Sequence, residues 1–396
     1  MAKQPKIRFK GFTEEWKEKT VEEVSIRLDN LRIPIAASLR VAGDTPYYGA
    51  NGIQDYVEGY THDGENILIA EDGARDTDVY PVRITRGKIW VNNHAHVLRG
   101  INGVMSNPFL LYALLKTDFS KILVGGTRHK LTTKALNSTI ISFTQDEKEQ
   151  KAITQTLSLF DTTISQRETE LEKLKNIKRA LLEKLFPQDG QSIPAIRFKG
   201  FEGKWENRRL KDIATRITRK NIGLESTLPL CISAQLGLVS QTEYYNNVVV
   251  GANLANYFLI KKGEFAYNKS AAGEYPMGAV KCLKSPDKGI LSTLYIVFAL
   301  KDDIDADYVQ AHYETKPWQD DVKKRVAVGA RNHGLLNISP EDFFDSLVVI
   351  PHNNDEQKKV GQILAKLSQT ISLRERQLTL LKHTKQALLE QMFVNE

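Results

Sequence analysis

Residues 149–186 read EQKAITQTLSLFDTTISQRETELEKLKNIKRALLEKLF, and this stretch decides how the chain folds. Its apolar residues recur at alternating spacings of four and three, and neither proline nor glycine interrupts them. A heptad pattern sustained over nearly five repeats is typical of a long helix that packs along one face against another helix. Because Pro187 follows directly, we expect one continuous helix that ends there.

Residues 356–393, EQKKVGQILAKLSQTISLRERQLTLLKHTKQALLEQMF, repeat this pattern 207 positions later, with Gly361 as the single internal glycine. Two apolar seams of equal length on one chain favour pairing with each other, and the pattern alone permits parallel or antiparallel pairing. Cations interrupt both series at matching places: Arg167, Lys178, Arg374 and Lys385. We expect these side chains to bury their stems and extend their charges to solvent.

A shorter phrase, IRFKGF, occurs at both Ile7–Phe12 and Ile196–Phe201, 189 positions apart. Trp16 and Trp205 hold matching places after it, so the repeat is longer than the phrase. The segments between phrase and helix show no convincing match between the halves. The chain therefore divides near residue 188 into two half-molecules, in which similar framing segments surround dissimilar inserts. We expect the phrase to pack near the helix ends rather than to bind a ligand.

The composition fits a folded protein of more than one domain. The chain has 396 residues, 41% of them hydrophobic, and a net charge of +7, which suits a polyanionic partner but is a weak indicator alone. Cys231 and Cys282 form no CxxC pair, which favours free thiols in a reducing compartment. There is no apolar run of 18 residues and no signal-peptide pattern, so we expect a cytoplasmic protein without a membrane segment.

The inserts carry strand and turn patterns. In the first, YYGANGIQDYV (47–57) and GKIWVNNHAHVL (87–98) predict strands, and NPFLLYALLKT (107–117) predicts a short helix. In the second, GEFAYNKS (263–270) and STLYIVFAL (292–300) have the same style, followed by a helical segment. Each insert is therefore expected to be an α+β domain with a mostly antiparallel sheet.

Both inserts finish with a basic glycine loop, GGTRHK at 125–130 and VGARNHG at 328–334. Glycine lets a backbone approach a phosphate closely, and Arg, Lys, His and Asn side chains supply hydrogen-bond donors. Arg can also fork onto guanine and Asn onto adenine. A loop of this kind is often a simple solvated turn, but its presence at the same place in both halves favours a binding role.

Catalytic motifs are not evident. There is no GxxxxGK[ST] phosphate loop, and the nearest match to the Asp/Asn-Pro-Pro-aromatic tetrapeptide of adenine methyltransferases, SNPF at 106–109, lacks the second proline. His94 and His96 would face the same side of a strand, but no third ligand is apparent nearby. Packing or polar contact with DNA is therefore the favoured role for them, and we expect no metal and no cofactor.

The complete order of segments resembles the specificity subunit of type I restriction–modification systems. The resemblance covers almost the whole chain and rests on both IRFKGF phrases, both helical stretches, and insert phrases such as YYGANGIQDYV, NNHAHVL and GEFAYNKS. It implies an α+β fold with two target-recognition domains of mostly antiparallel sheet. Two long helices would separate them, paired as an antiparallel coiled coil in a pseudo-two-fold repeat.

The same resemblance implies a non-catalytic subunit that reads a bipartite site in double-stranded DNA. The helices would act as a ruler between the half-sites, and methyltransferase subunits and restriction motor-nuclease subunits would be its partners. The expected domains are a first recognition domain (1–145), a first helix (146–187), a second recognition domain (188–352) and a second helix (353–396).

Candidate DNA contacts come from the loops and polar turns of both inserts: Arg128, His129, Lys130, Lys269, Ser270, Arg331, Asn332, Tyr47, Tyr48, Asn51 and Arg75. Two other functions remain open, a free-standing DNA-binding regulator and the scaffold of a modification-only methyltransferase. An active methyltransferase is disfavoured because the Pro-Pro tetrapeptide is missing.

Overall fold

The structure is a computed structural model that describes residues 4–77, 79–126, 129–188, 190–233, 237–245, 253–270, 275–326 and 335–394. It forms two compact units: unit 1 comprises Met1–Gln166 with Leu378–Glu396, and unit 2 comprises Arg167–Gln377. The two long helices are α4 (Glu147–Leu185) and α10 (Asn354–Met392), so both predicted helices are confirmed. Each unit contains part of both helices, a division that the four expected domains do not have.

Unit 1 contains three sheets, with strand orders β1-β9, β2-β8-β5-β6 and β4-β3-β7. All of their strand pairs are antiparallel except β3 with β7. The elements before α4 are β1 (Lys17–Thr20), α1 (Val21–Val24), β2 (Ser25–Arg27), β3 (Ala42–Gly49), β4 (Gly52–Val57), β5 (Asn66–Ala70), β6 (Val82–Thr85), β7 (Trp90–Val91), β8 (Ala95–Gly100), α2 (Asn107–Lys116), α3 (Thr133–Ser138) and β9 (Ile140–Phe143).

Unit 2 contains the antiparallel sheets β10-β19, β11-β18-β15-β16, β12-β13 and β14-β17. Its elements before α10 are β10 (Glu206–Arg209), α5 (Leu210–Ile213), β11 (Ala214–Ile217), β12 (Leu230–Ser233), β13 (Gly237–Ser240), α6 (Gln241–Tyr245), β14 (Phe258–Lys261), β15 (Phe265–Asn268), β16 (Ala279–Cys282), β17 (Lys288–Leu291), β18 (Ile296–Leu300), α7 (Ala306–His312), α8 (Lys316–Arg325), α9 (Pro340–Phe344) and β19 (Leu347–Ile350).

The two inserts share one sheet plan although their sequences do not match. In unit 1, β2 pairs with β8, β8 pairs with β5, and β5 pairs with β6. In unit 2, β11 pairs with β18, which pairs with β15 and then β16. The α+β fold with mostly antiparallel sheets is therefore confirmed, and the internal repeat extends into the inserts.

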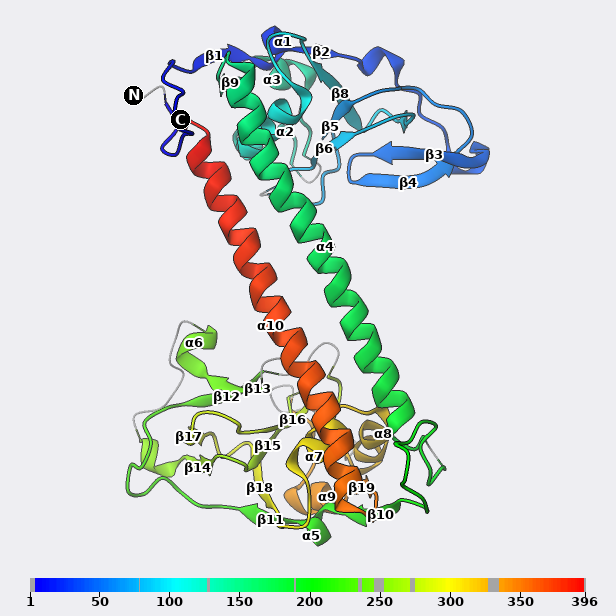
Figure 1. Cartoon of the computed structure of the whole chain (residues 1–396), viewed down its shortest axis with the longest axis vertical. Helices are drawn as coiled ribbons and strands as arrows, with labels where there is room; N and C mark the ends of the chain where they lie inside the picture. Colours follow the sequence, from blue (N-terminus) through cyan, green and yellow to red (C-terminus); the bar gives the residue numbers. More distant parts are fainter. Residues whose placement is uncertain are drawn as a thin grey trace. The chain divides into compact units, whose positions relative to one another are not determined.

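In each unit the two long helices run side by side in opposite directions (Figure 1). Unit 1 holds the first half of α4 with the last turns of α10, and unit 2 holds the opposite ends. Aromatic clusters fix these ends to the sheets. Trp16, Phe109 and Phe393 pack together with ring centroids 5.0–5.7 Å apart in unit 1. Phe186, Trp205 and Tyr308 form the matching cluster in unit 2.

The arginine of each IRFKGF phrase forms a bidentate ion pair with a glutamate at the start of a long helix. Arg8 forks onto Glu149, with Nε–Oε1 and Nη2–Oε2 distances of 2.6 and 2.9 Å. Arg197 forks onto Glu356 in the same way, at 2.7 and 2.8 Å. Both carboxylates are almost completely buried, so bidentate pairing is what offsets their desolvation.

The residue before each arginine reaches the end of the other long helix. The Ile7 amide donates to the Gln391 carbonyl and the Ile196 amide to the Lys184 carbonyl, each at 2.9 Å. These carbonyls belong to the last turn of each helix, where the carbonyl groups have no amide donor within their own helix. The phrase therefore joins one helix start to one helix end in each unit, which explains why it is written twice.

Two of the heptad cations, Lys178 and Lys385, form partly buried ion pairs instead of extending into solvent. Lys178 lies 2.6 Å from Glu314 of unit 2, and Lys385 forms an ion pair with Asp161 of unit 1. Tyr112 of α2 donates to the same Asp161 at 2.7 Å. In the part of the chain that the structure describes, no helix has the length and apolar character needed to span a membrane.

Candidate nucleic-acid interface

Three segments of unit 1 that are far apart in the sequence converge at one end of its sheets. They are the turn between β3 and β4, the loop after β5, and the segment that follows the first basic glycine loop. This convergence brings together Asn51, Arg75, His129 and Lys130, which sequence reasoning selected separately. Arg75, His129 and Lys130 are exposed there.

Asn51 holds the loop after β5 against the β3–β4 turn. Its Nδ2 donates to the Gly73 carbonyl at 2.8 Å, and its Oδ1 accepts from the Arg75 amide at 2.9 Å. The side chain thus satisfies two backbone groups and fixes the position of a loop that would otherwise be free to move. Asn51 is therefore placed to position Arg75 rather than to supply a donor of its own.

The residues just after β5 are also hydrogen-bonded to residues 129–131, at the end of the first basic glycine loop. The Leu131 amide donates to the Glu71 carbonyl at 2.7 Å, and the Gly73 amide donates to the His129 carbonyl at 3.3 Å. Lys130 lies 3.0 Å from Glu71 through its side chain, which neutralises part of its charge. Arg128, the strongest candidate from the sequence, lies outside the described residues.

A partly buried charge network supports this loop cluster from below. Glu71 lies 2.7 Å from Arg32, and His96 lies 2.7 Å from Asp29. Burial alone would raise the pKa of Asp29, but hydrogen bonds from His96 and the Val97 amide, with the charge of Arg32, hold it below its usual value. For Glu71, burial is likewise outweighed by Arg32 and Lys130, and its pKa is lowered. Both carboxylates therefore remain ionised at neutral pH.

Asp29, Glu71 and His96 lie close enough together to hold a metal ion. However, the Arg32 guanidinium contacts both carboxylates, at 2.7 Å for Glu71 and 3.5 Å for Asp29. Both His96 nitrogens are also occupied, by Asp29 and by the Leu131 carbonyl. A cation already compensates the negative charge here, so the chemistry of this set is that of an ion-pair network.

The expected strand at 87–98 is interrupted, which separates the two histidines. The Asn92 side chain accepts from the His94 amide at 2.9 Å and forms a turn between β7 and β8. His94 therefore stands in the turn, where it pairs with Asp72, and His96 is fully buried in β8. The expectation that both face the same side of one strand is wrong because this turn breaks the alternation.

Tyr47 and Tyr48, the two candidate tyrosines of YYGANGIQDYV, occupy different environments. Tyr47 is 1% exposed, its hydroxyl lies 3.0 Å from the Ile35 amide, and Arg40 stacks 4.1 Å above its ring. Tyr47 therefore lies in the core, with its hydroxyl and its ring both in contact with protein groups. Tyr48 is half-buried, and burial raises its pKa while the nearby charge of Arg83 opposes the rise.

Unit 2 repeats the strand-end arrangement at the place of the second basic loop. The Leu336 amide donates to the Lys269 carbonyl at 2.9 Å, and Ser270 pairs with Leu335. The Ser270 amide also donates to the Asn268 side chain at 3.0 Å. Lys269 and Ser270 therefore lie where the chain returns from the loop. The loop residues Arg331 and Asn332 lie outside the described residues.

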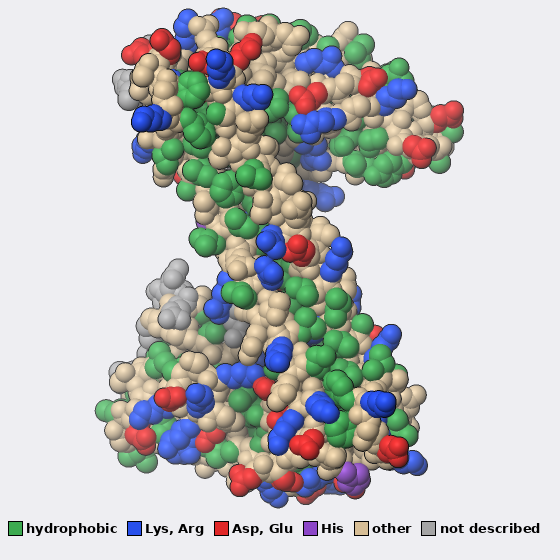
Figure 2. All heavy atoms as spheres, in the orientation of Figure 1, with side chains coloured by type: hydrophobic (Ala, Val, Ile, Leu, Met, Phe, Trp, Pro, Cys, Tyr) green, Lys and Arg blue, Asp and Glu red, His purple; other side chains and the backbone are tan. Residues whose placement is uncertain are grey.

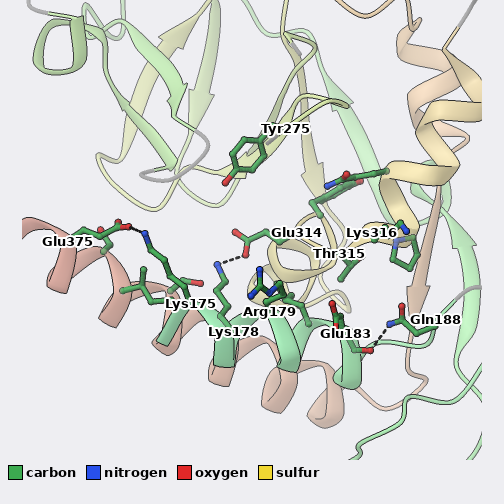
Figure 3. Close-up of a pocket in the computed structure, with 17 residues that line it drawn as sticks. Lys175, Lys178, Arg179, Glu183, Gln188, Tyr275, Glu314, Thr315, Lys316 and Glu375 are labelled. Carbon is green, nitrogen blue, oxygen red and sulfur yellow. Dashed lines mark hydrogen bonds and ion pairs between the residues drawn. The ribbon is translucent and has the colours of Figure 1, made fainter. Parts of the chain in front are cut away.

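A cavity of about 470 Å³ in unit 2 lies between the helices and α8. Figure 3 shows Lys175 paired with Glu375 and Lys178 paired with Glu314 across it. Lys281 also contacts Glu314, at 2.9 Å. These ion pairs join α4 to α10 through Glu375, and α4 to β16 through Glu314.

Over the face that Figure 2 shows, Lys and Arg side chains are mixed with Asp and Glu on each unit. The net charge therefore does not mark a DNA-binding face by itself. Sequence reasoning also missed Arg83 of β6, a half-buried arginine beside Tyr48 and Gly52. The alternating strand VRIT (82–85) was a signal for an inward-facing charge, but its neighbours were not readable from the sequence.

Comparisons with known proteins agree with this architecture. A family model described as the type I restriction modification DNA specificity domain matches residues 13–176. A Haemophilus influenzae protein named as a type I restriction enzyme specificity subunit is 48% identical over 126 residues, which are 32% of this chain and 32% of that protein. The match thus spans about a third of the length of that relative.

The crystal structure of the S subunit of a type I restriction-modification system from M. genitalium superimposes with a TM-score of 0.73. It is 16% identical, and the match covers 99% of this chain and 100% of that one. Residues 13–176 thus match the type I restriction modification DNA specificity domain, and the fold of the chain is similar to that of the M. genitalium S subunit.

Proposed function

We propose that this chain is a non-catalytic, sequence-specific DNA-binding subunit that reads a bipartite site, one half-site with each unit. The observation that carries the proposal is the repeated strand-end arrangement, in which the segment leaving a basic glycine loop is hydrogen-bonded to the end of β5 or β15. In both units this fixes the base of a loop rich in donors. Fixed loops with Arg, Lys, His and Asn side chains suit readout of phosphates and base edges.

The contact residues of this proposal fall into two groups. In unit 1 the exposed group is Arg75, His129 and Lys130, with Asn51 as the residue that positions the loop, and Arg128 belongs with them by sequence. In unit 2 they are Lys269 and Ser270, with Arg331 and Asn332 by sequence. Tyr48 is a further candidate because its hydroxyl end is half-buried beside Arg83.

Recruitment of methyltransferase subunits and of motor-nuclease subunits is the second part of the proposal. Large apolar side chains are exposed on the long helices, and a partner protein that covered them would remove this apolar surface from water. Leu159 of α4 and Leu380 of α10 are 66% and 67% exposed in unit 1. Ile177 and Leu373 are 51% and 56% exposed in unit 2. These positions favour a helical partner over a free-standing regulator.

The third part is that the helices set the distance between half-sites. α4 and α10 are each 39 residues long and pass without a break from one unit into the other. At 1.5 Å per residue, each spans about 58 Å, which exceeds one turn of B-DNA at about 34–36 Å. An uninterrupted helix of that length suits a rigid spacer.

Methylome sequencing of the host with and without this gene tests the proposal. We expect methylated adenines in one two-part motif that vanish on deletion, together with co-purification of a methyltransferase subunit. A protein that binds DNA but leaves the methylome unchanged would instead be a regulator. Methylation without restriction of incoming unmodified DNA would favour the modification-only scaffold.

A further inference from the structure

Arg83 stands at the edge of the four-stranded sheet of unit 1. It lies on β6, opposite Leu68 of β5, and Leu68 faces the small core that β5 and β8 share with Ile89 and Val91. Tyr48 of β3 packs on the same small core. The Arg83 guanidinium therefore projects toward the β3–β4 hairpin, at the end where the candidate loops converge.

No described residue accepts a hydrogen bond from this guanidinium. Among the residues that the structure describes, none lies within hydrogen-bonding or ion-pair distance of it, and Tyr48 is the single charged or titratable group whose field it feels. Burial lowers its pKa from the usual value, although an arginine stays charged at neutral pH. A half-buried cation with five unused donors carries a desolvation cost that an anion would offset.

Gly52 leaves room for this guanidinium beside the β3–β4 turn. Its φ is +121°, and a Cβ at this position would clash with Nη1 of Arg83. Any other residue would therefore both strain the turn and displace the guanidinium. In this turn, Asn51 therefore positions the loop after β5, and Gly52 leaves room for the Arg83 guanidinium.

The equivalent cation of unit 2 is neutralised, which makes the contrast informative. Lys281 of β16 lies opposite Ala266 as Arg83 lies opposite Leu68, and Ala266 and Leu68 pair with Val297 and Val97 at matching places. Lys281 contacts the carboxylate of Glu314 at 2.9 Å. The same sheet position therefore has an internal counter-ion in unit 2, whereas the described residues of unit 1 provide none.

We infer that Arg83 binds a phosphate of the DNA backbone, which supplies the counter-ion that no described residue of unit 1 provides. The inference rests on the proposed function and adds to it a residue that fixes the register of unit 1 on the duplex. A phosphate carries a full negative charge and protrudes from the duplex, so it can reach a set-back guanidinium and compensate it. A neutral guanine edge would satisfy the donors but leave the charge uncompensated.

The test compares full-length wild type with Arg83→Gln on a duplex that carries the methylated motif and on an unrelated duplex, across a salt series. We expect Arg83→Gln to bind both duplexes several-fold more weakly and the slope of log K against log salt to fall by about one. Replacing single phosphates with neutral methylphosphonates should weaken wild type at one position and leave Arg83→Gln unaffected there. Arg86→Gln, which removes an exposed cation of the neighbouring turn, is the matched control.

Gly52→Ala provides a second variant that keeps the charge but displaces it, and it should also reduce affinity. Because no described residue forms a hydrogen bond or an ion pair with Arg83, Arg83→Gln should unfold at a temperature close to that of wild type. If wild type binds DNA and Arg83→Gln shows the same slope of log K against log salt, the assignment of Arg83 is wrong, and the proposed function stands. If Arg83→Gln instead lost affinity through a single base pair of the motif, with the salt slope unchanged, Arg83 would contact a base and not a phosphate. If wild type has no affinity for either duplex, both proposals fail.

Discussion

The two bidentate arginine–glutamate ion pairs offer a direct test of how the repeated phrase stabilises the chain. Arg8→Met removes the guanidinium that forks onto Glu149 and leaves a carboxylate with no exposed surface. Removal of one partner from a buried ion pair costs about 3–5 kcal/mol, because the other charge stays buried without compensation. Arg197→Met makes the same change to Glu356 in unit 2.

The structure predicts that the second change costs more than the first. Arg197 also donates to the carbonyls of Glu202 and Gly203, at 2.8 and 2.6 Å, and pairing with Glu356 raises its pKa. Arg8 instead has a buried Nη1 without a partner, so its removal also relieves a desolvation cost of about 1–3 kcal/mol. We therefore expect Arg197→Met near the upper end of the range and Arg8→Met near or below the lower end.

Urea unfolding combined with hydrogen exchange, followed by mass spectrometry, would measure each unit separately. Arg8→Met should accelerate exchange at the β1–β9 pair and the start of α4, and Arg197→Met should do so in unit 2. The double variant Arg8→Met with Glu149→Met should recover much of the lost stability, since it removes the uncompensated charge. A loss below about 1 kcal/mol for Arg197→Met, or a double variant less stable than Arg8→Met, would refute the reasoning.

Three further predictions concern pH, the spacer and the loop cluster. Burial lowers the pKa of His312 to about 4, so between pH 6.5 and 4 the unfolded chain binds a proton that the folded chain does not. Unit 2 should therefore lose up to roughly 3 kcal/mol as the pH falls through this window, and His312→Phe should remove that part of the urea-midpoint profile. Inserting four residues after Glu172 of α4 should lengthen the spacer of the methylated motif while both half-sites persist, and an unchanged spacer would contradict the ruler. Asn51→Ala should accelerate amide exchange at Gly73 and Arg75 and weaken DNA binding a few-fold. Exchange at the wild-type rate would show that the loop after β5 keeps its position without Asn51.

Much of the framework could be predicted from local pattern. Helices of 39 residues leave a heptad signature that no short-range alternative imitates, and their observed ends lie within two residues of the patterned stretches. The short helix α2 likewise follows from Ser106 as its cap, Pro108 in its first turn and the apolar run behind them. These signals are local, so tertiary contacts had little to override.

The sheet plan of the inserts could not be predicted in the same way. The pairing of β2 with β8, or of β11 with β18, joins strands more than 70 residues apart, and any apolar strand of similar length would fit the pattern. Its selection depends on which side chains fill the cores together, and that depends on the whole domain. The turn at Asn92 that splits an expected strand arises from one side-chain hydrogen bond.

By itself, the sequence determined that the chain is duplicated, where each half begins, and that two long helices join the halves, because periodicity and repetition are properties of the chain order. Only the tertiary structure decided what those repeats do. It showed that Arg8 and Arg197 bind buried carboxylates at helix starts, and that Asn51 is a clasp within a loop cluster. It also showed that Lys281 has a counter-ion, while no described residue supplies one for Arg83. Pairing and burial are properties of neighbours in space, and the energy of a charge depends on those neighbours far more than on its place in the sequence.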